Sequence, residues 1–449
     1  MTASHRSSPA MAIRGTRGAI LIIVMWVCFG LAALALYFAE STAMELRSAD
    51  NRVVSLAAES AVDGGARYVQ FVLSRHAANG SLPLSTDYLA EDVPVGDAAF
   101  WILGRDPNLA PSTDPVFNIV DEASKLNINT ASRAMLEALP GMTIELAAAI
   151  IDWRDRNSEP TENGAEDETY ARLDPPRLAK NAPFESIDEL RLVYGATLRI
   201  LFGEDTNRNG TLDPNEDDGD ASQPMDDRDG VLSPGILEYV TVYSRQPRTR
   251  ADGGQRINVQ LPDQRPRLVQ LLSTKLGEAR AQSILSGVGS SPVASVAEFM
   301  IRGRFTAAEF QQIHTDITGT DVTGLINVNT APEAVLACIP GFDWDKARAI
   351  VAYRSAHPDA LSSFAWLPEV LDRATIVRAG RYLTDQSYQF SADIVAVGPY
   401  GRGYSRAKFV FDTRRDLPRI LSRQDLTAAG WALGSAQRDQ LRDHLVARR

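Results

Sequence analysis

The feature that most constrains the fold is an uninterrupted apolar run near the N-terminus, Ala19 to Ala39, which reads AILIIVMWVCFGLAALALYFA. Its 21 residues include no charged residue and no proline. A helix of this length spans roughly 32 Å, about the hydrocarbon thickness of a bilayer. Three arginines precede the run, whereas two glutamates are the first charged residues after it. We therefore predict one transmembrane helix, with a short cytoplasmic N-terminus and the bulk of the chain across the membrane.

A cleaved secretory signal is the alternative, because Ala33-Leu34-Ala35 has the small residues of a cleavage site. The apolar run is longer than the roughly 7–15 residues of a usual signal core, which favours a retained helix. Residues 41–62 contain no glycine or proline, so the helix is expected to continue to about Ser74. We assign 19–39 to its transmembrane part and 40–74 to its extramembrane part.

Gly18 separates the basic leader from the apolar run that begins at Ala19. This junction resembles the cleavage site of type IV prepilins, in which a membrane peptidase cuts after the glycine. The resemblance implies a leader at 1–18, processing between Gly18 and Ala19, and a prepilin peptidase as a partner. Most pilin-like subunits carry glutamate at the fifth residue after the cut, where this chain has Ile23. A subunit without that carboxylate lacks the docking contact to the subunit above, which fits the tip of a fibre.

The chain contains an internal repeat. Residues 126–155 and 326–355 align without gaps at an offset of 200 residues, with 12 identities in 30 positions, and a weaker third copy occupies 257–287. The two clear copies share N-x-N-T-A, a leucine, Pro-Gly and a C-terminal arginine. Each copy predicts a short strand, a helix, a tight turn and a second helix. This arrangement resembles the helix-hairpin-helix module.

Members of that module that bind DNA normally have a second glycine in the hairpin, so that backbone N–H groups approach a phosphate. Both hairpins here, Pro140-Gly141-Met142-Thr143 and Pro340-Gly341-Phe342-Asp343, lack it. A net charge of -11 also opposes binding to nucleic acid. We therefore expect no nucleic-acid partner and interpret the helix pairs as packing units. A membrane-tethered DNA-binding protein involved in DNA uptake is the alternative.

Strand-like segments flank the helical region, and one lies within it. They are 98–103, 116–120, 239–244, 388–397 and 407–412. We predict an α+β fold in which the long N-terminal helix packs on a small antiparallel sheet built from both ends of the chain. The expected domains are 75–125 and 385–412 for the sheet, 126–384 for an inserted helical domain, and 413–449 for a C-terminal extension.

Residues 205–216 read DTNRNGTLDPNE and fit the twelve-residue calcium loop of an EF-hand. The expected ligands are oxygens of Asp205, Asn207, Asn209, Thr211 (through its carbonyl), Asp213 and Glu216. Residues 204–229 carry ten carboxylates and two arginines, which would repel one another without a cation. The segment after Glu216 is too rich in Asp, Gly and Pro for a regular second helix. A solvated acidic loop is the alternative, and Asp226, Asp227 and Asp229 are a candidate second calcium site.

The sequence predicts no enzyme. Its five histidines are scattered without zinc-ligand spacing, and it has neither a phosphate-binding glycine loop nor a nucleophile elbow. A secreted calcium-binding enzyme would need a catalytic constellation that the sequence does not offer.

A succession of motifs resembles the minor pseudopilin K family of the type II secretion system. The motifs are Asp152-Trp153-Arg154-Asp155, Gly164-Ala165-Glu166, Tyr170, the run from Lys180 to Phe184, and the run from Asp188 to Gly195. The resemblance implies a pilin-like domain carrying an inserted α-domain that binds calcium. It also implies a single-pass inner-membrane protein with a periplasmic body, at the pseudopilus tip with the other minor pseudopilins. Residues 245–325 and those after Asp412 match the family least.

Overall fold

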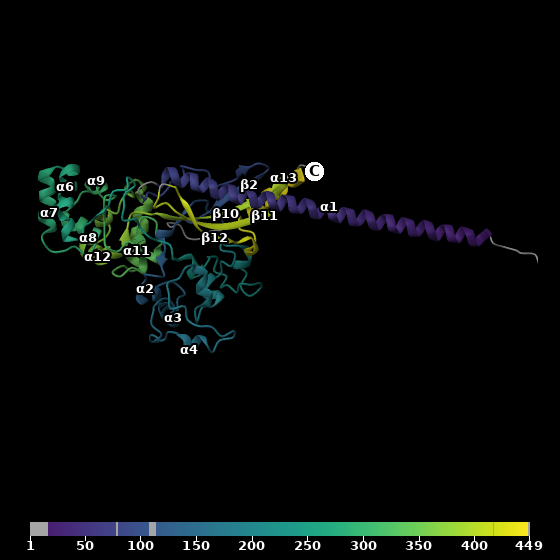
Figure 1. Ribbon diagram of the computed structural model, residues 1–449, viewed down its shortest axis with the longest axis horizontal. Helices are drawn as coiled ribbons and strands as arrows, with labels where there is room; N and C mark the ends of the chain where they lie inside the picture. Colours follow the sequence, from purple (N-terminus) through teal and green to yellow (C-terminus); the bar gives the residue numbers. More distant parts are fainter. Residues whose placement is uncertain (1–16, 78–79, 107–113, 416, 448–449) are drawn as a thin grey trace, which may run out of the picture.

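The computed structural model describes residues 17–77, 80–106, 114–415 and 417–447. Residues 1–16 of the expected leader lie outside the described residues. The first element, α1, is one continuous helix over Arg17–His76, two residues longer at each end than expected. It projects far beyond the rest of the molecule (Figure 1). In the described part of the chain it is the one helix long and apolar enough to cross a membrane.

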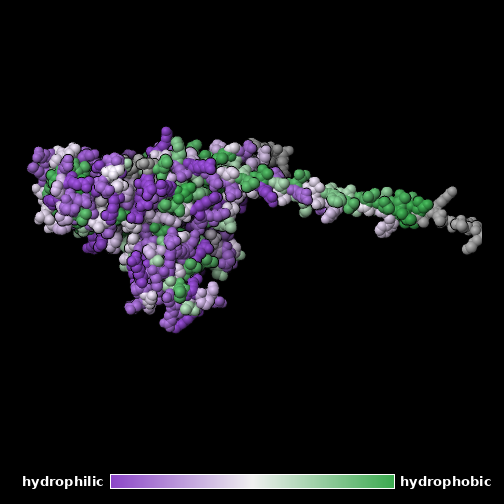
Figure 2. Space-filling model, in the orientation of Figure 1, coloured by the Kyte–Doolittle hydropathy of each residue, from purple (hydrophilic) through white to green (hydrophobic). Residues whose placement is uncertain are grey.

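The two halves of α1 have different surroundings. In the first half, apolar side chains are exposed on every side, including Trp26, which is 76% exposed. These side chains form the apolar end of the projecting rod (Figure 2). In the second half Ala58, Ala61, Val62 and Val69 are fully buried. Their positions i, i+3, i+4 and i+11 place them on one face of the helix, which packs against the sheet.

The sheet is antiparallel, with strand order β1-β2-β10-β11-β12, and β3 pairs beside β2 on β10. The strands are β1 (Val93–Val95), β2 (Ala98–Leu103), β3 (Val120–Asp121), β10 (Gln389–Val397), β11 (Tyr404–Asp412) and β12 (Arg419–Asp425). Strands from both ends of the chain therefore form one sheet, as the sequence predicts. The α+β class is confirmed, with a long N-terminal helix packed on an antiparallel sheet and additional helical regions.

The central strand β10 buries both of its faces because successive side chains point to opposite sides. Phe390 and Ile394 contribute to the core beneath α1. Val395 contributes to a smaller core on the other face, together with Ala432 and Leu433 from the C-terminal region. Ile394 pairs with Ile102 of β2 on one side and with Ala407 of β11 on the other. The sheet is thus covered on both faces where β10 crosses it.

The helical region between the two parts of the sheet has its own core. Its helices are α2 (Arg133–Glu137), α3 (Ile144–Arg154), α4 (Asp167–Tyr170), α5 (Leu198–Phe202), α6 (Arg265–Leu276), α7 (Glu278–Val288), α8 (Val296–Gly303), α9 (Ala307–Gln311), α10 (Glu333–Ala337), α11 (Trp344–Ala356) and α12 (Arg373–Ala379). Figure 1 shows α6 to α9 at the end of the body opposite the free part of α1, whereas α2 to α4 form an arm to one side.

Each repeat copy opens with a two-residue strand that pairs in parallel with a later segment. The pairs are β4 (Leu126–Asn127) with β5 (Val240–Thr241), β6 (Ile257–Asn258) with β7 (Ile317–Thr318), and β8 (Ile326–Asn327) with β9 (Leu383–Thr384). In the two clear copies a short helix, a turn and a longer helix follow. The third copy has two long helices, α6 and α7.

Three segments differ from their expected strands or boundaries. Of the residues expected to form a strand at 116–120, only Val120 lies in a strand, β3. Phe117 forms one isolated bridge to Leu103. Only two residues of 239–244 are extended, because their partner β4 is itself two residues long. The sheet does not end at Asp412, since β12 pairs along β11. The chain then ends in α13 (Gly434–Ala447).

Candidate functional site

The acidic loop at 205–216 folds back on itself and brings its carboxylate and amide side chains together. Asp205 accepts hydrogen bonds from the backbone N–H groups of Asn209 and Gly210, each at 2.9 Å. The side-chain amides of Asn207 and Asn209 meet at Asp213 Oδ2, at 2.7 and 2.9 Å. Four of the six expected ligand residues therefore lie within this network. A side-chain amide that makes a half-turn presents its oxygen instead of its nitrogen.

Glu216 closes the loop. It accepts from the backbone N–H of Thr206 at 3.2 Å and from that of Asp213 at 3.1 Å. The loop is entered by α5 and left by a single 3-10 turn, Pro214–Glu216, with no regular helix over 217–229. Gly210 has φ +74°, and a Cβ there would lie 2.5 Å from the Arg105 guanidinium. Glycine is required at this place for both reasons.

The loop buries its acidic groups close together. Asp205 is 3% exposed and Glu216 is 1% exposed. Burial, followed by the neighbouring Asp205 carboxylate, raises the pKa of the Glu216 carboxyl to about 8. Burial also raises the pKa of Asp205, although Arg105 opposes that rise. Two buried carboxyl groups in mutual repulsion favour a cation, so the residues present fit calcium.

Counted by His, Cys, Asp and Glu alone, no group of three or more is placed to hold a metal ion in the described part of the chain. The remaining oxygens would therefore come from the two asparagine amides and the Thr211 carbonyl. Thr211 is buried, and its backbone N–H donates to Asn209 Oδ1 at 2.8 Å.

Two arginines from the sheet hold the backbone of the loop. Arg406, on β11, donates to the carbonyl oxygens of Asn207 at 2.5 Å and Arg208 at 2.8 Å. Arg105, which follows β2, donates to the carbonyls of Arg208 at 3.1 Å and Asn209 at 3.0 Å. The sequence reading missed both residues. Arg406 directly precedes the strand expected at 407–412, and nothing in the local sequence connected it to the loop.

The second acidic set does not form one cluster. Asp226 accepts from the N–H groups of Asp218 and Gly219, at 3.1 and 2.8 Å, and so closes a turn. Asp226 and Asp227 lie near Glu204, where burial raises the pKa of the Glu204 carboxyl and the two aspartates raise it further. Asp229 is exposed and accepts from Val231 N–H at 2.8 Å. Glu204 is an acidic neighbour that the sequence reading did not include.

The clear repeat copies share an internal clamp. Asn127 and Asn327 each accept at Oδ1 from the N–H group two residues later, at 3.0 Å in both copies. Arg354, 1% exposed, donates to the carbonyls of Val328 at 2.9 Å and Ala331 at 2.8 Å. Arg154 donates to the equivalent carbonyls in its own copy. The arginines therefore lock each copy internally.

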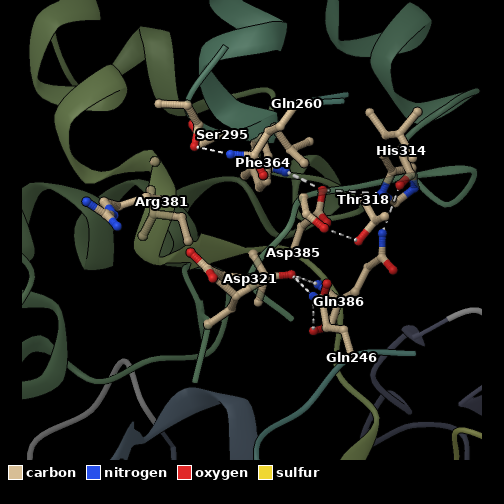
Figure 3. A pocket seen from close by; sticks show the side chains of 18 of the residues that line it. Gln246, Gln260, Ser295, His314, Thr318, Asp321, Phe364, Arg381, Asp385 and Gln386 are labelled. Carbon is tan, nitrogen blue, oxygen red and sulfur yellow. Dashed lines mark hydrogen bonds and ion pairs between the residues drawn. The ribbon is translucent and has the colours of Figure 1, made fainter. Parts of the chain in front are cut away.

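A small polar pocket lies between the region of residues 294–321 and the segment of residues 380–386 (Figure 3). His314 and Asp385 face one another there, with Nδ1 and Oδ2 3.2 Å apart, and both are buried or nearly so. Burial alone would lower the pKa of His314, but the Asp385 carboxylate outweighs burial and the pKa is raised. Gln386 donates to the His314 carbonyl at 3.0 Å. The pair joins residues 245–325 to the end of the last repeat copy.

The expected processing residues, Gly18 and Ala19, lie in the first turn of α1. Ile23, at the place of the pilin glutamate, is 60% exposed on the free part of the helix. The structure thus presents an apolar surface at this place.

Comparisons with known proteins agree on one family. Two family models described as type II secretion system protein K match this chain, one at residues 118–201 and the other at residues 326–380. The first match covers the motifs between Asp152 and Gly195, and the second covers the last repeat copy. The acidic loop at 205–216 lies outside both matches.

Curated proteins named type II secretion system protein K are similar over short segments. The protein from Klebsiella pneumoniae is 43% identical over 56 residues, and that from Pectobacterium carotovorum subsp. carotovorum is 45% identical over 51 residues. These segments cover 12% and 11% of this chain. The chain spans only 17% and 16% of the length of these relatives.

Among solved structures, the crystal structure of the GspK-GspI-GspJ complex from the enterotoxigenic Escherichia coli type 2 secretion system is similar, with a TM-score of 0.36 and 12% identity. That likeness covers 86% of this chain and 99% of the solved chain. Both family models and both curated relatives carry the same description. Over residues 118–201 and 326–380 the chain is therefore similar to type II secretion system protein K.

Proposed function

We propose that this protein is a minor pseudopilin that caps the tip of the type II secretion pseudopilus and takes part in protein secretion across the outer membrane. The main observation behind this proposal is that α1 has two different halves. The first half exposes its apolar side chains, and the second half packs on the sheet. A rod of this kind can be anchored in a membrane, or packed among other apolar helices, while it holds a folded body at one end. Similarity to that family supports the same role, which is structural and not enzymatic.

The proposed topology follows from the same helix. The leader would be removed after Gly18, residues 19–39 would cross the inner membrane once, and the body would lie in the periplasm. Residues 40–74 would form the outer part of a pilin-like helix, with residues 75–125 and 385–412 as the pilin-like sheet. Residues 126–384 would be an inserted domain whose helix-hairpin-helix-like repeats pack against one another, and 413–449 would be an extension of the sheet.

Calcium is the proposed structural ion. Asp205, Asn207, Asn209, Asp213 and Glu216 would hold it with side-chain oxygens, and Thr211 with its carbonyl. When bound, the ion would supply the positive charge that the buried carboxylates lack. A second site at Asp226, Asp227 and Asp229 would require a rearrangement of this segment, because the three carboxylates do not form one cluster.

The proposed partners are other minor pseudopilins, and the prepilin peptidase during maturation. Exposed apolar side chains on α1 would pack against neighbouring helices, and Ile23 would accept no charged contact from a subunit above it. Co-purification of the full chain in detergent with each candidate minor pseudopilin, in calcium and in chelator, tests this proposal. Recovery of a stable complex that chelator weakens is the expected result. If no candidate co-purifies in either condition, the tip assignment fails.

The alternative of DNA binding has little support from the hairpins. Asp343 caps α11 by accepting from Lys346 N–H at 2.9 Å, and its other oxygen pairs with the Lys346 ammonium. A carboxylate therefore stands at the turn where a DNA-binding hairpin approaches phosphate. A filter-binding assay at moderate salt separates the two functions, because DNA uptake requires salt-sensitive affinity for DNA.

A further inference from the structure

An arginine-lined cleft lies where three segments meet: the end of α1, the hairpin at 247–256, and the loop between β11 and β12. Its volume is about 370 Å³. Four of its lining residues are Arg250, Arg256, Arg414 and Arg415. All three segments lie outside both family matches. Such a concentration of guanidinium groups is unexpected in a chain whose net charge is -11.

Arg256 is the most telling member of this cleft. It is 5% exposed, and its Nε has no hydrogen-bond partner. Its Nη1 donates to Gln386 Oε1 at 2.6 Å, and its Nη2 contacts the hydroxyl of Tyr388. Both acceptors are neutral, so no hydrogen-bonded carboxylate offsets the buried charge. A buried cation without an anion is unfavourable, and an anion in the cleft would relieve this cost.

The other three arginines leave an excess of positive charge. Arg250 pairs with Asp252 at 3.0 Å and with Asp316 at 3.3 Å, and Arg414 pairs with Asp412 at 2.8 Å. These ion pairs fix the two guanidinium groups in place. Arg415 is exposed. In the described part of the chain, three carboxylates therefore pair with two of the four guanidinium groups that line the cleft.

We propose that this cleft binds a ligand through an oxyanion, either a carboxylate or a phosphate group. Guanidinium groups present planar pairs of N–H donors that match the oxygens of such groups. The cleft has room for a ligand larger than a single ion. The proposal depends on neither calcium nor the membrane anchor, so its failure would leave the proposed function intact.

The test is a calorimetric titration of the full chain in detergent, at constant ionic strength. Inorganic phosphate and citrate probe a free oxyanion, and an end-capped oligo-aspartate peptide probes carboxylates from another protein. Saturable binding of phosphate or citrate identifies a free ligand. Binding of the peptide alone identifies an acidic protein segment. Either result supports oxyanion recognition, and absence of saturable binding by all three probes overturns it.

Variants locate the binding. Arg415→Gln is expected to weaken binding about tenfold, because it removes one charge-assisted contact, and Arg256→Met is expected to abolish it. Arg199→Gln, the same change at an exposed position on α5, is expected to bind as the wild type does. Equal binding by Arg415→Gln and Arg199→Gln would overturn the assignment even if Arg256→Met fails to fold.

One further variant tests whether the chain supplies its own anion. Asp416 follows Arg415 in the sequence and lies outside the described residues. Binding by Asp416→Asn but not by the wild type would overturn the proposal of an external ligand.

Discussion

Arg406 Nη2 donates a hydrogen bond of 2.8 Å to the backbone carbonyl of Arg208, and so ties the central part of the sheet to the acidic loop. The same guanidinium pairs with Asp393 of β10 through two contacts, of 2.9 and 2.6 Å. Arg406 is fully buried. One side chain therefore links two neighbouring strands and a loop that is distant in sequence.

Removing this link should be costly. Arg406→Met leaves the Asp393 carboxylate buried without its partner, and we expect unfolding free energy to fall by about 3 kcal/mol or more. Chemical denaturation of the full chain in detergent measures the change. The matched control is Arg423→Met on β12, whose ion pair with Asp63 is half exposed, with an expected loss below about 1 kcal/mol. Equal denaturation midpoints for the two variants would contradict the assigned role of Arg406.

Calcium should raise the melting temperature of the full chain relative to chelator. At a free concentration of about 100 times Kd, the stabilisation is roughly 2.7 kcal/mol. Asp205→Ala combined with Glu216→Ala should abolish the shift because both carboxylates face the same centre. Asp345→Ala on α11, where the side chain is 94% exposed, is the control. An unchanged shift in the double variant would show that the ion binds elsewhere.

The His314–Asp385 pair should make stability depend on pH. The pKa of His314 is raised in the folded protein, so its contribution is complete below the unfolded value of about 6.5 and is lost as the pH rises through the folded value. The difference in unfolding free energy between wild type and His314→Gln should therefore shrink with rising pH. His357→Gln, at an exposed histidine, provides the control. A difference that grows toward alkaline pH would have the wrong sign for this pair.

The clamp inside each repeat can be tested on α11. Arg354→Met removes the donors to two buried carbonyls, and we expect a loss of about 2 kcal/mol of unfolding free energy. Arg348→Met lies on the same helix with a side chain that is 64% exposed, and should cost below about 1 kcal/mol. Urea denaturation compares the two. Similar losses would mean that Arg354 does not lock the copy.

Processing at the membrane predicts a defined mature end. Intact mass of the purified protein should correspond to a chain that starts at Ala19 and retains Trp26. Gly18→Leu should leave the leader attached, since a bulky side chain replaces the small residue at the cleaved bond. An intact Met1 in the wild type, or a start near Ala35, would exclude prepilin-type maturation.

The sequence was most informative where one residue type dominates a long segment. The apolar run predicted α1, and the strand-like segment 388–397 predicted the central strand β10, because each reflects a large buried or lipid-facing surface. β12 was missed because its exposed polar residues, such as Arg419 and Arg423, carry no such pattern. Its place in the sheet comes from hydrogen bonding to β11.

The acidic loop shows a similar limit. The twelve-residue spacing predicted which side chains would gather, and the structure brings Asp205, Asp213 and the two asparagines together. Arg105 and Arg406 lie far away in sequence, and nothing in the local spacing connects them to the loop. Contacts between residues that are distant in sequence can be identified only once the fold is known.

The length of exposed helix between the apolar run and the body sets the distance between the two. The run ends at Ala39, and the first ion pair with the body is that of Asp50 with Arg402, at 2.6 Å. These eleven residues of helix measure roughly 16 Å along the axis. An exposed helical segment of that length would keep the folded body clear of lipid headgroups. It would also leave room beside it for the helices of neighbouring subunits.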